Sequence, residues 1–278
     1  MLSYRHAFHA GNHADVLKHI VLALIIDYLK QKEKPLWYID THAGAGRYAL
    51  DSFEAKKNAE YASGITRLLE QRAVLPALLK PYFDVIDDEH RLNQNSYPGS
   101  PVFAAQLLRD QDRLRLFEMH PQDSATLRDN LEYDRRVTIG DSDGFASLKA
   151  LLPPPSRRAL VLIDPPYELK EDYVRVVTSM QEALRRFATG TYAIWYPLLP
   201  RAEAARLPQQ LAALQAPALR IELRVTEAQG EFGMYGSGMF VVNPPWLLHD
   251  QMKIVLPLLQ SLLGEAGRSG FVLEATGS

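Results

Sequence analysis

The spacing of apolar positions changes several times along the chain, and each change predicts a helix or a strand. Apolar residues recur at helical spacing in 14–31, 172–187 and 201–215, although a proline interrupts the last stretch. Short apolar runs predict strands at 36–40, 114–118, 137–139, 159–163, 192–197, 219–225 and 238–242. The last two runs flank a glycine-rich loop and are expected to form the terminal strand pair. Because strands that alternate with helices build a parallel sheet covered on both faces, we predict an α/β protein with a mostly parallel seven-stranded sheet.

Residues 51–97 break this alternation. They contain helical patterns and local charge but no convincing strand, and they end in the turn sequence Y-P-G-S-P at 97–101. We interpret them as a small inserted helical subdomain. The predicted organisation is a main domain of residues 1–50 and 98–278, with the insertion at 51–97. Beside the active face, the insertion either grips the substrate or has no functional role.

Composition narrows the class of protein. The chain has 278 residues, of which 47% are hydrophobic and 23% charged, as in an ordinary soluble globular protein. No apolar run approaches the ~20 residues of a membrane span, and the first residues lack the apolar core of a signal peptide, so we expect a cytoplasmic protein with no membrane contact. The absence of cysteine excludes disulfides, thiolate zinc sites and cysteine nucleophiles. With a formal net charge of −2, a nucleic-acid partner would need a local basic surface.

The amino-terminal segment is rich in histidine. Four of the eight histidines in the chain are His6, His9, His13 and His19. Two of these four are spaced i, i+4, which would suit a metal ion on a helix, but a Gly-Asn turn signal separates them, so we predict no metal site. We interpret residues 1–15 as a functional tail of cationic and aromatic groups; the alternative is a solvated arm. Lys18 follows early in the predicted helix, where the tail can bring it to a ligand.

Acidic residues stand at the ends of the first predicted strands. Asp40 ends the first strand and leads into a loop with Gly44 and Gly46. This D-x-x-x-G-x-G spacing lacks both the dinucleotide fingerprint and a P-loop lysine, and it resembles the first cofactor motif of Rossmann-like methyltransferases. Glu118 ends the second strand, where such folds hydrogen-bond a ribose. Asp143 follows the third strand, where an acid can face the amino group of a cofactor's adenine.

The strand at 159–163 carries the clearest candidate chemistry. Its five apolar residues predict burial on both faces, and Asp164-Pro165-Pro166-Tyr167 follows directly. Two prolines cannot continue a sheet ladder, so the strand ends there, at the edge where open α/β sheets bind ligands. The Asp164 carboxylate and the Pro165 carbonyl accept hydrogen bonds, and Tyr167 offers an aromatic face. The tetrapeptide resembles the D-P-P-Y motif of amino-group methyltransferases, which use S-adenosylmethionine.

A second tetrapeptide, Asn243-Pro244-Pro245-Trp246, also follows a predicted strand. It resembles the N-P-P-Y variant of the same motif. In these enzymes the catalytic motif follows the fourth strand, whereas Asn243 follows the seventh. We therefore interpret Asn243 as part of a structural turn.

Taken together, these segments resemble the bacterial RlmJ family. The resemblance rests on the tail up to His19, the T-H-A-G-A-G-R-Y loop at 41–48, the turn at 97–101 and the D-P-P-Y box. It covers essentially the whole chain and is weakest in 51–97. It implies a Rossmann-like class I methyltransferase that uses S-adenosylmethionine to methylate N6 of one adenosine in 23S ribosomal RNA during ribosome biogenesis. We expect a monomer.

The resemblance also assigns roles to matching residues. Those implied to contact S-adenosylmethionine are His19, His42, Ser100, Glu118, Asp143, Gly144 and Asp164. Tyr4 is implied to touch the RNA substrate, with His6 nearby. In the reaction, Asp164 and the Pro165 carbonyl would accept the two hydrogens of the N6 amino group, while Tyr167 would stack on the flipped base.

Three other functions share part of this pattern. A DNA adenine-N6 methyltransferase would share every chemical motif, and only contacts to 2′-hydroxyl groups would separate the two. A nicotinamide-dependent oxidoreductase would explain the glycine loop and Glu118 but not the D-P-P-Y box. A non-catalytic RNA-binding module would bind RNA without methyl transfer.

Overall fold

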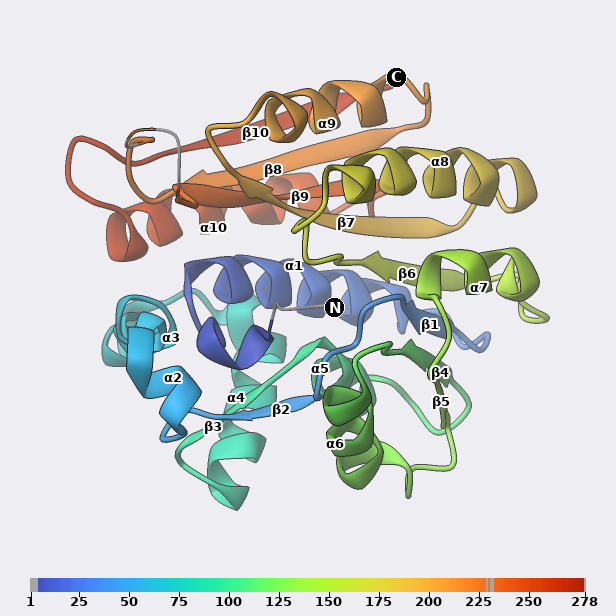
Figure 1. Ribbon diagram of the computed structural model, residues 1–278, viewed down its shortest axis with the longest axis horizontal. Helices are drawn as coiled ribbons and strands as arrows, with labels where there is room; N and C mark the ends of the chain where they lie inside the picture. The colour runs from blue at the N-terminus through green and yellow to red at the C-terminus, as the bar shows by residue number, and fades with distance from the viewer. Residues whose placement is uncertain (1–4, 229, 231–232, 278) are drawn as a thin grey trace.

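A single large sheet forms the centre of the protein. The computed structural model describes residues 5–228, 230 and 233–277. The strands of the sheet are β1 (Trp37–Asp40), β4 (Arg113–Phe117), β5 (Val137–Gly140), β6 (Ala159–Ile163), β7 (Thr191–Leu198), β8 (Ala218–Arg224), β9 (Gly236–Val242) and β10 (Gly270–Thr276). Their order in space is β10-β8-β9-β7-β6-β1-β4-β5 (Figure 1).

The direction of each strand decides which loops meet. β1, β4, β5, β6 and β7 are parallel, so their carboxyl ends share one edge of the sheet. β9 is antiparallel to both β7 and β8, and β10 is antiparallel to β8. The carboxyl end of β9 therefore lies at the opposite edge, beside the amino ends of the parallel strands.

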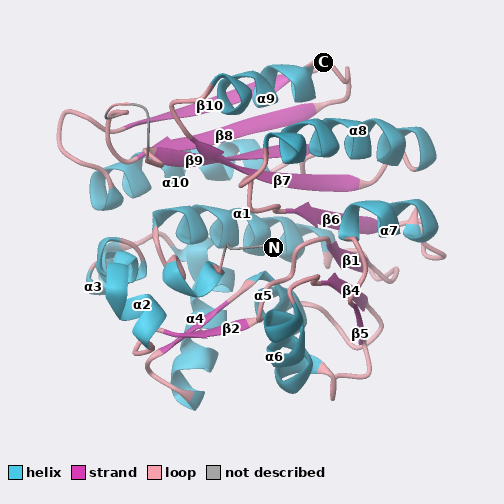
Figure 2. Ribbon diagram, viewed as in Figure 1, coloured by secondary structure: helices cyan, strands magenta, loops and turns pink. Residues whose placement is uncertain are grey.

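Helices cover both faces of the sheet (Figure 2). One face carries α1 (His13–Leu29), α5 (Ser100–Leu107) and α10 (Leu248–Leu263), and the other carries α7 (Gly144–Leu151), α8 (Lys170–Arg186) and α9 (Ala202–Ala212). β6 contributes to both cores, because Leu160 and Leu162 pack on the first side and Val161 and Ile163 on the second. The predicted buried strand and the predicted α/β class are confirmed.

The region of the predicted insertion is helical. Its elements are α2 (Phe53–Asn58), η2 (Glu60–Ser63), α3 (Ile65–Glu70), η3 (Arg72–Val74), η4 (Ala77–Leu79) and α4 (Lys80–Leu92). Two short strands, β2 (Arg47–Ala49) and β3 (Ser96–Pro98), pair antiparallel at its base. α4 packs against α1 and α5, so the insertion extends the core on that face. The division at 51–97 stays our proposal.

The strand count predicted from the sequence was wrong. The sheet has eight strands, because β10 adds an edge strand beyond the pair that we expected to be terminal. β10 lies at the outer edge, and none of its residues is buried. An exposed edge strand does not need the continuous apolar run by which the other seven were found.

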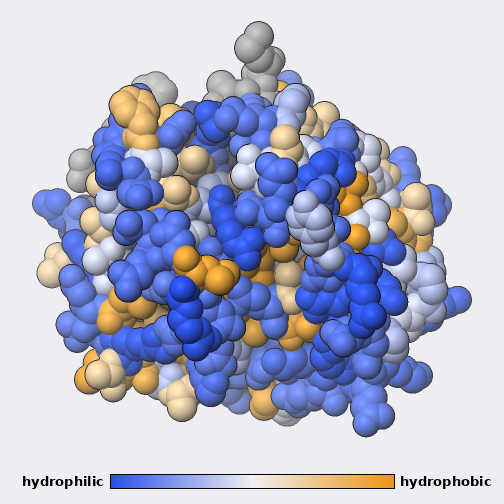
Figure 3. Space-filling model, turned by 90° about the horizontal axis from the view of Figure 1, so that it is seen from below, coloured by the Kyte–Doolittle hydropathy of each residue, from blue (hydrophilic) through white to orange (hydrophobic). Residues whose placement is uncertain are grey.

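The lower face of the protein is mainly polar (Figure 3). Figure 3, which views the protein from below, shows a largely hydrophilic face with small separate groups of hydrophobic residues. Of the described helices, none combines the length and the apolar character that a membrane crossing needs. α6 (Pro121–Leu131) lies beside the edge strand β5 on this lower side (Figure 1).

Candidate active site

A cavity of about 420 Å³ lies at the carboxyl ends of β1, β4, β6 and β7. Its volume is within the range of small-molecule and cofactor pockets. The sequence-predicted residues that line it are His6, His19, His42, Ser100, Glu118, Asp143, Asp164 and Pro165. Gly144 and Tyr167 are not among the lining residues. Tyr4 lies outside the residues that the structure describes.

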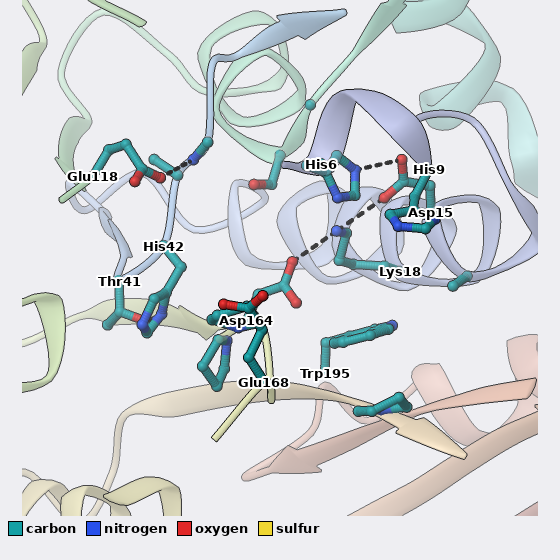
Figure 4. A pocket seen from close by; sticks show the side chains of 18 of the residues that line it. His6, His9, Asp15, Lys18, Thr41, His42, Glu118, Asp164, Glu168 and Trp195 are labelled. Atoms are coloured by element: carbon teal, nitrogen blue, oxygen red, sulfur yellow. Dashed lines mark hydrogen bonds and ion pairs between the residues drawn. The ribbon is translucent and has the colours of Figure 1, made fainter. Parts of the chain in front are cut away.

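A buried lysine contacts the catalytic candidate. Lys18 Nζ donates to Asp164 Oδ2 at 2.7 Å and to Asp15 Oδ1 at 2.9 Å. Asp15 Oδ2 in turn lies 2.8 Å from His6 Nε2. Figure 4 shows the resulting chain, which runs from the amino-terminal segment through α1 to the end of β6. The sequence-predicted substrate residue His6 is thereby linked to Asp164 through Asp15 and Lys18, neither of which the sequence assigns a role in the reaction.

Local sequence explains why α1 presents Lys18 at this point. Asn12 caps the helix, since its side chain accepts hydrogen bonds from the amides of Ala14 and Asp15 at 2.9 and 3.0 Å. Asp15 and Lys18 are spaced i, i+3 and therefore project from the same side of α1. Their ion pair is almost completely buried.

Charge pairing outweighs burial in this chain of residues. Burial alone would lower the pKa of Lys18, but the carboxylates of Asp15 and Asp164 raise it well above its ordinary value. Burial alone would raise the pKa of Asp15, but His6 and Lys18 hold it well below its usual range. Lys18 is therefore a fixed cation, which orients the Asp164 carboxylate in the cavity.

Tyr167 points away from the cavity, in contrast to the expected stacking position. Its backbone is left-handed, with φ 53°, and its ring packs against Tyr173 and Trp195. Its hydroxyl donates to the Trp195 carbonyl at 2.7 Å. The left-handed turn after two prolines redirects the side chain into the core. Trp195, from β7, lines the cavity near Lys18 (Figure 4), and Tyr48 is a second aromatic residue of the lining.

Glu118 holds the glycine loop. Its Oε2 accepts from the Gly44 amide at 2.8 Å, and its Oε1 accepts from the His120 amide at 2.7 Å. Gly44 has φ 62°, and a Cβ there would lie 2.2 Å from the Tyr48 hydroxyl, so the loop requires glycine. Each carboxylate oxygen keeps a further lone pair for a ligand hydroxyl. Burial raises the pKa of Glu118.

Buried polar groups lie between Glu118 and Asp164. Asp40 accepts from the hydroxyls of Ser100 and Tyr38, each at 2.7 Å, and burial raises its pKa to about 6. His19 is completely buried: its Nδ1 lies 3.0 Å from the Tyr97 hydroxyl, while no described residue pairs with its Nε2. A buried nitrogen without a partner at a cavity wall is suited to a bound ligand.

The third group of predicted cofactor residues surrounds the start of α7. Asp143 caps this helix by accepting from the Phe145 amide, and it also pairs with Arg175. Gly144 packs so closely on Thr41 that a Cβ would lie 2.1 Å from the Thr41 carbonyl oxygen. In this structure Gly144 therefore allows α7 to pack closely on the end of β1. Burial lowers the pKa of His42 to about 3, so this imidazole is neutral.

Sequence reasoning missed Asp15 and Trp195 as parts of the cavity and did not connect Lys18 to Asp164. Lys18 had a usable signal, since it and the neighbouring His19 are polar residues within the mainly apolar stretch 16–26 of a helix that follows a histidine-rich tail. The sequence carries no such signal for Trp195, because its pattern is that of any residue in a buried strand.

A family model, two relatives and a solved structure are similar to this chain over nearly its whole length. A family model described as ribosomal RNA large subunit methyltransferase D, RlmJ, matches residues 33–274. The ribosomal RNA large subunit methyltransferase J of Escherichia coli K12 is 52% identical over 269 residues, which are 96% of this chain and 96% of that protein. The Haemophilus influenzae protein of the same description is 50% identical over 280 residues, covering 99% and 98%. The crystal structure of protein LPL1258 from Legionella pneumophila matches with a TM-score of 0.90 at 38% identity, covering 97% of this chain and 99% of that one.

Proposed function

This chain belongs to the RlmJ family of ribosomal RNA large subunit methyltransferases, and we propose that it methylates N6 of one adenosine in 23S ribosomal RNA. It is an S-adenosylmethionine-dependent methyltransferase. The observation that supports the choice of nitrogen is the Asp164-Pro165 turn, which faces the cavity while Lys18 fixes its carboxylate.

The cavity suits S-adenosylmethionine. Glu118 can accept the ribose hydroxyls with its remaining lone pairs, and Asp143 stands where it can accept from the adenine amino group. His19 and Ser100 are among the residues that line the cavity, and the buried Nε2 of His19 has no partner among the described residues. When bound there, the cofactor supplies an electrophilic methyl group, so the chemistry left to the protein is orientation and proton removal.

Asp164 and Pro165 would orient the target amine. The lone pair of an adenine amino group is delocalised into the ring and is a poor nucleophile. Hydrogen bonds from its two N–H groups to the Asp164 carboxylate and the Pro165 carbonyl would favour a tetrahedral nitrogen with an available lone pair. Since Lys18 donates to Oδ2 of Asp164, Oδ1 would be the oxygen that accepts from the substrate. Methylation makes the nitrogen cationic, so its proton leaves without a strong base.

The target adenosine would leave its stack to enter the cavity. Trp195 is the aromatic side chain in position to contact the flipped base, a role that we had expected of Tyr167. His6, at the rim, and Tyr4, which lies before the described residues, would contact the RNA. We further propose that a cytoplasmic monomer suffices, because residues of one chain supply both the carboxylates and the aromatic wall.

Methyl transfer from S-adenosylmethionine to a 23S ribosomal RNA transcript tests this proposal. The wild type should produce N6-methyladenosine at one position, identified by nuclease digestion and mass spectrometry. Asp164→Ala should lose about 10²-fold or more in turnover, because an acceptor at the reacting nitrogen is gone. A DNA oligonucleotide of the same sequence serves as the rival substrate. Faster methylation of DNA, or a methylated carbon or ribose oxygen in RNA, would refute the proposed substrate or nitrogen.

A further inference from the structure

A second cavity lies at the opposite edge of the same strands. Its volume is about 520 Å³, and it opens below the amino ends of β1, β6 and β7. Its walls come from the end of α1 and the loop that leads to β1, from residues 156–159, and from Thr189 and Thr191 before and in β7. No residue of this cavity lines the active-site cavity.

The lining of this cavity is strongly basic. Lys32, Lys34, Arg157 and Arg158 line it together with the hydroxyl residues Ser156, Thr189 and Thr191, and the lining contains no carboxylate. In the part of the chain that the structure describes, Lys32, Lys34 and Arg157 form no ion pair, although most lysines and arginines of this protein do. In a chain with a net charge of −2, four cations around one cavity form a local basic surface.

Two arginines hold the wall of the cavity in place. Arg158 donates to the carbonyls of Leu29 and Lys34, and Arg109 donates to the carbonyls of Lys30, Lys32 and Lys34 at 2.8, 2.7 and 3.2 Å. Arg158 also donates to the Lys32 carbonyl at 3.4 Å, so six hydrogen bonds from the two arginines fix the cation-bearing segment. Burial and the neighbouring Arg109 lower the pKa of Arg158, and the Asp112 carboxylate, which pairs with Arg109, opposes this shift.

Arg157 adds an independent observation. Its φ is 53°, in the left-handed region, where a long side chain is strained and glycine is preferred. A turn hydrogen bond from its amide to the Pro154 carbonyl, at 2.9 Å, holds it there. Strained non-glycine residues gather at ligand sites, where the position of the side chain matters more than the cost of the backbone. This strain places a fourth cation at the rim.

We propose that this basic cavity binds phosphate groups. Guanidinium, ammonium and hydroxyl donors without a competing carboxylate are the groups that bind phosphate oxygens. Two sources share this chemistry, the backbone of an RNA and a small phosphate-bearing molecule. Ala159 of the basic cavity and Asp164 of the active-site cavity stand at the two ends of β6, so about 17 Å of strand separates them. If the phosphate groups belong to RNA, the bound RNA must extend well beyond the target adenosine. Only this alternative, and not the binding of a small molecule, rests on the proposed function.

Inorganic pyrophosphate is the first probe, with binding measured by calorimetry at low salt. The test variant is Lys32→Glu with Lys34→Glu. The matched control is Lys80→Glu with Lys253→Glu, which changes the net charge equally at two exposed positions outside every described cavity. The wild type and the control should bind alike, and the test variant about tenfold or more weakly. Unchanged S-adenosylmethionine affinity in both variants shows that the fold is intact.

Ribosomal RNA fragments of two lengths form the second arm. The affinity of a long fragment should fall in the test variant, and the slope of log affinity against log salt should shrink by about 1 to 2 units, as expected for two lost phosphate contacts. A short fragment that carries only the target region should be bound and methylated as by the wild type. Weaker binding of long RNA by the test variant identifies the RNA backbone as the ligand. Weaker binding of pyrophosphate alone identifies a small phosphate-bearing molecule.

Arg157→Gly separates binding from stability. Glycine relieves the left-handed strain, so the melting temperature should rise while the affinity for pyrophosphate or long RNA falls. If Lys32→Glu with Lys34→Glu and Arg157→Gly bind both probes as the wild type does, the cavity is not a phosphate site. Methylation of the short fragment remains a separate readout, so this failure does not affect the proposed function.

Discussion

Two turns of similar sequence lie at opposite edges of one sheet. Asp164-Pro165-Pro166-Tyr167 follows β6, and the tetrapeptide at 243–246 follows β9. The first faces the active-site cavity. The second lies at the amino ends of the parallel strands, because β9 is antiparallel to its neighbour β7. Strand direction therefore decides which of the two turns can share an edge with the loops that follow β1, β4 and β5 and line the cavity.

The surroundings of the two turns differ in charge. Asp164 pairs with a buried cation, Lys18, in a region that also holds the buried acids Asp15 and Asp40. Asn243 makes neutral bonds only: its side-chain amide donates to the Ala188 and Gly190 carbonyls at 2.8 and 2.7 Å. These contacts and the position at the opposite edge support the interpretation of Asn243 as part of a structural turn, which stays a prediction. A motif becomes a catalytic candidate through what long-range packing places beside it, and the following variants test that contrast.

The largest effect is expected for Lys18→Met. This change leaves the buried Asp15 carboxylate and the partly buried Asp164 carboxylate without their shared cation, which costs about 3–5 kcal/mol of stability. Turnover should fall about 10²-fold or more because Asp164 loses its orientation. Single-turnover methylation and urea unfolding measure the two losses. Lys18→Arg, which keeps the charge, is the control. Wild-type turnover in a folded Lys18→Met protein would show that the ion pair is structural only.

The second variant, Asp40→Asn, tests how the stability of the protein depends on pH. Burial raises the pKa of Asp40 from 3.8 to about 6. Between about pH 4 and pH 6, Asp40 is therefore protonated in the folded protein but ionised in the unfolded chain. Above pH 6, Asp40 is ionised in the folded protein too, and its burial then reduces the free energy of unfolding. Stability should therefore rise as the pH falls from about 6 to 4, by up to about 3 kcal/mol.

Urea unfolding of the wild type and Asp40→Asn across pH 7 to 4 measures this contribution. The difference in unfolding free energy between the two proteins should shift in favour of the wild type as the pH falls. The same comparison for Asn243→Ala should show no shift, because the second turn has only neutral bonds. A pH-independent difference for Asp40→Asn would mean that Asp40 titrates as an ordinary aspartate.

Sequence reasoning succeeded where local patterns carry the information. Glu118, Asp143 and Asp164 follow apolar strands, and parallel strands bring their ends to one edge. The Lys18–Asp164 contact joins residues 146 positions apart, and no local pattern reports it. The inward direction of Tyr167 depends on one backbone angle after the two prolines. The RNA-facing roles of Tyr4 and His6 and the set of cofactor contacts stay predictions.

A third variant, Glu118→Ala, should weaken S-adenosylmethionine binding without affecting RNA binding. Each ribose hydrogen bond to a carboxylate is worth about 1.5–3 kcal/mol. The loop also loses its bonds from the Gly44 and His120 amides. Calorimetry should therefore show a rise in the dissociation constant of about 10- to 100-fold or more. Glu118→Gln, which keeps one acceptor oxygen, should lie between the wild type and the alanine variant. Equal cofactor affinity in all three proteins would limit Glu118 to holding the loop.

The smallest effect is expected at the second turn, where Asn243→Ala should reduce stability and leave catalysis unchanged. The variant loses two hydrogen bonds to backbone carbonyls, each worth about 0.5–1.5 kcal/mol. It also places alanine at φ 51°, a conformation that asparagine tolerates better. Asn243→Gly loses the same bonds without this strain and should therefore be the more stable of the two variants. Urea unfolding measures both, and single-turnover methylation should match the wild type in both. A loss of turnover beyond the loss of folded protein would show that the edge opposite the cavity takes part in the reaction, and the contrast between the two turns would then fail.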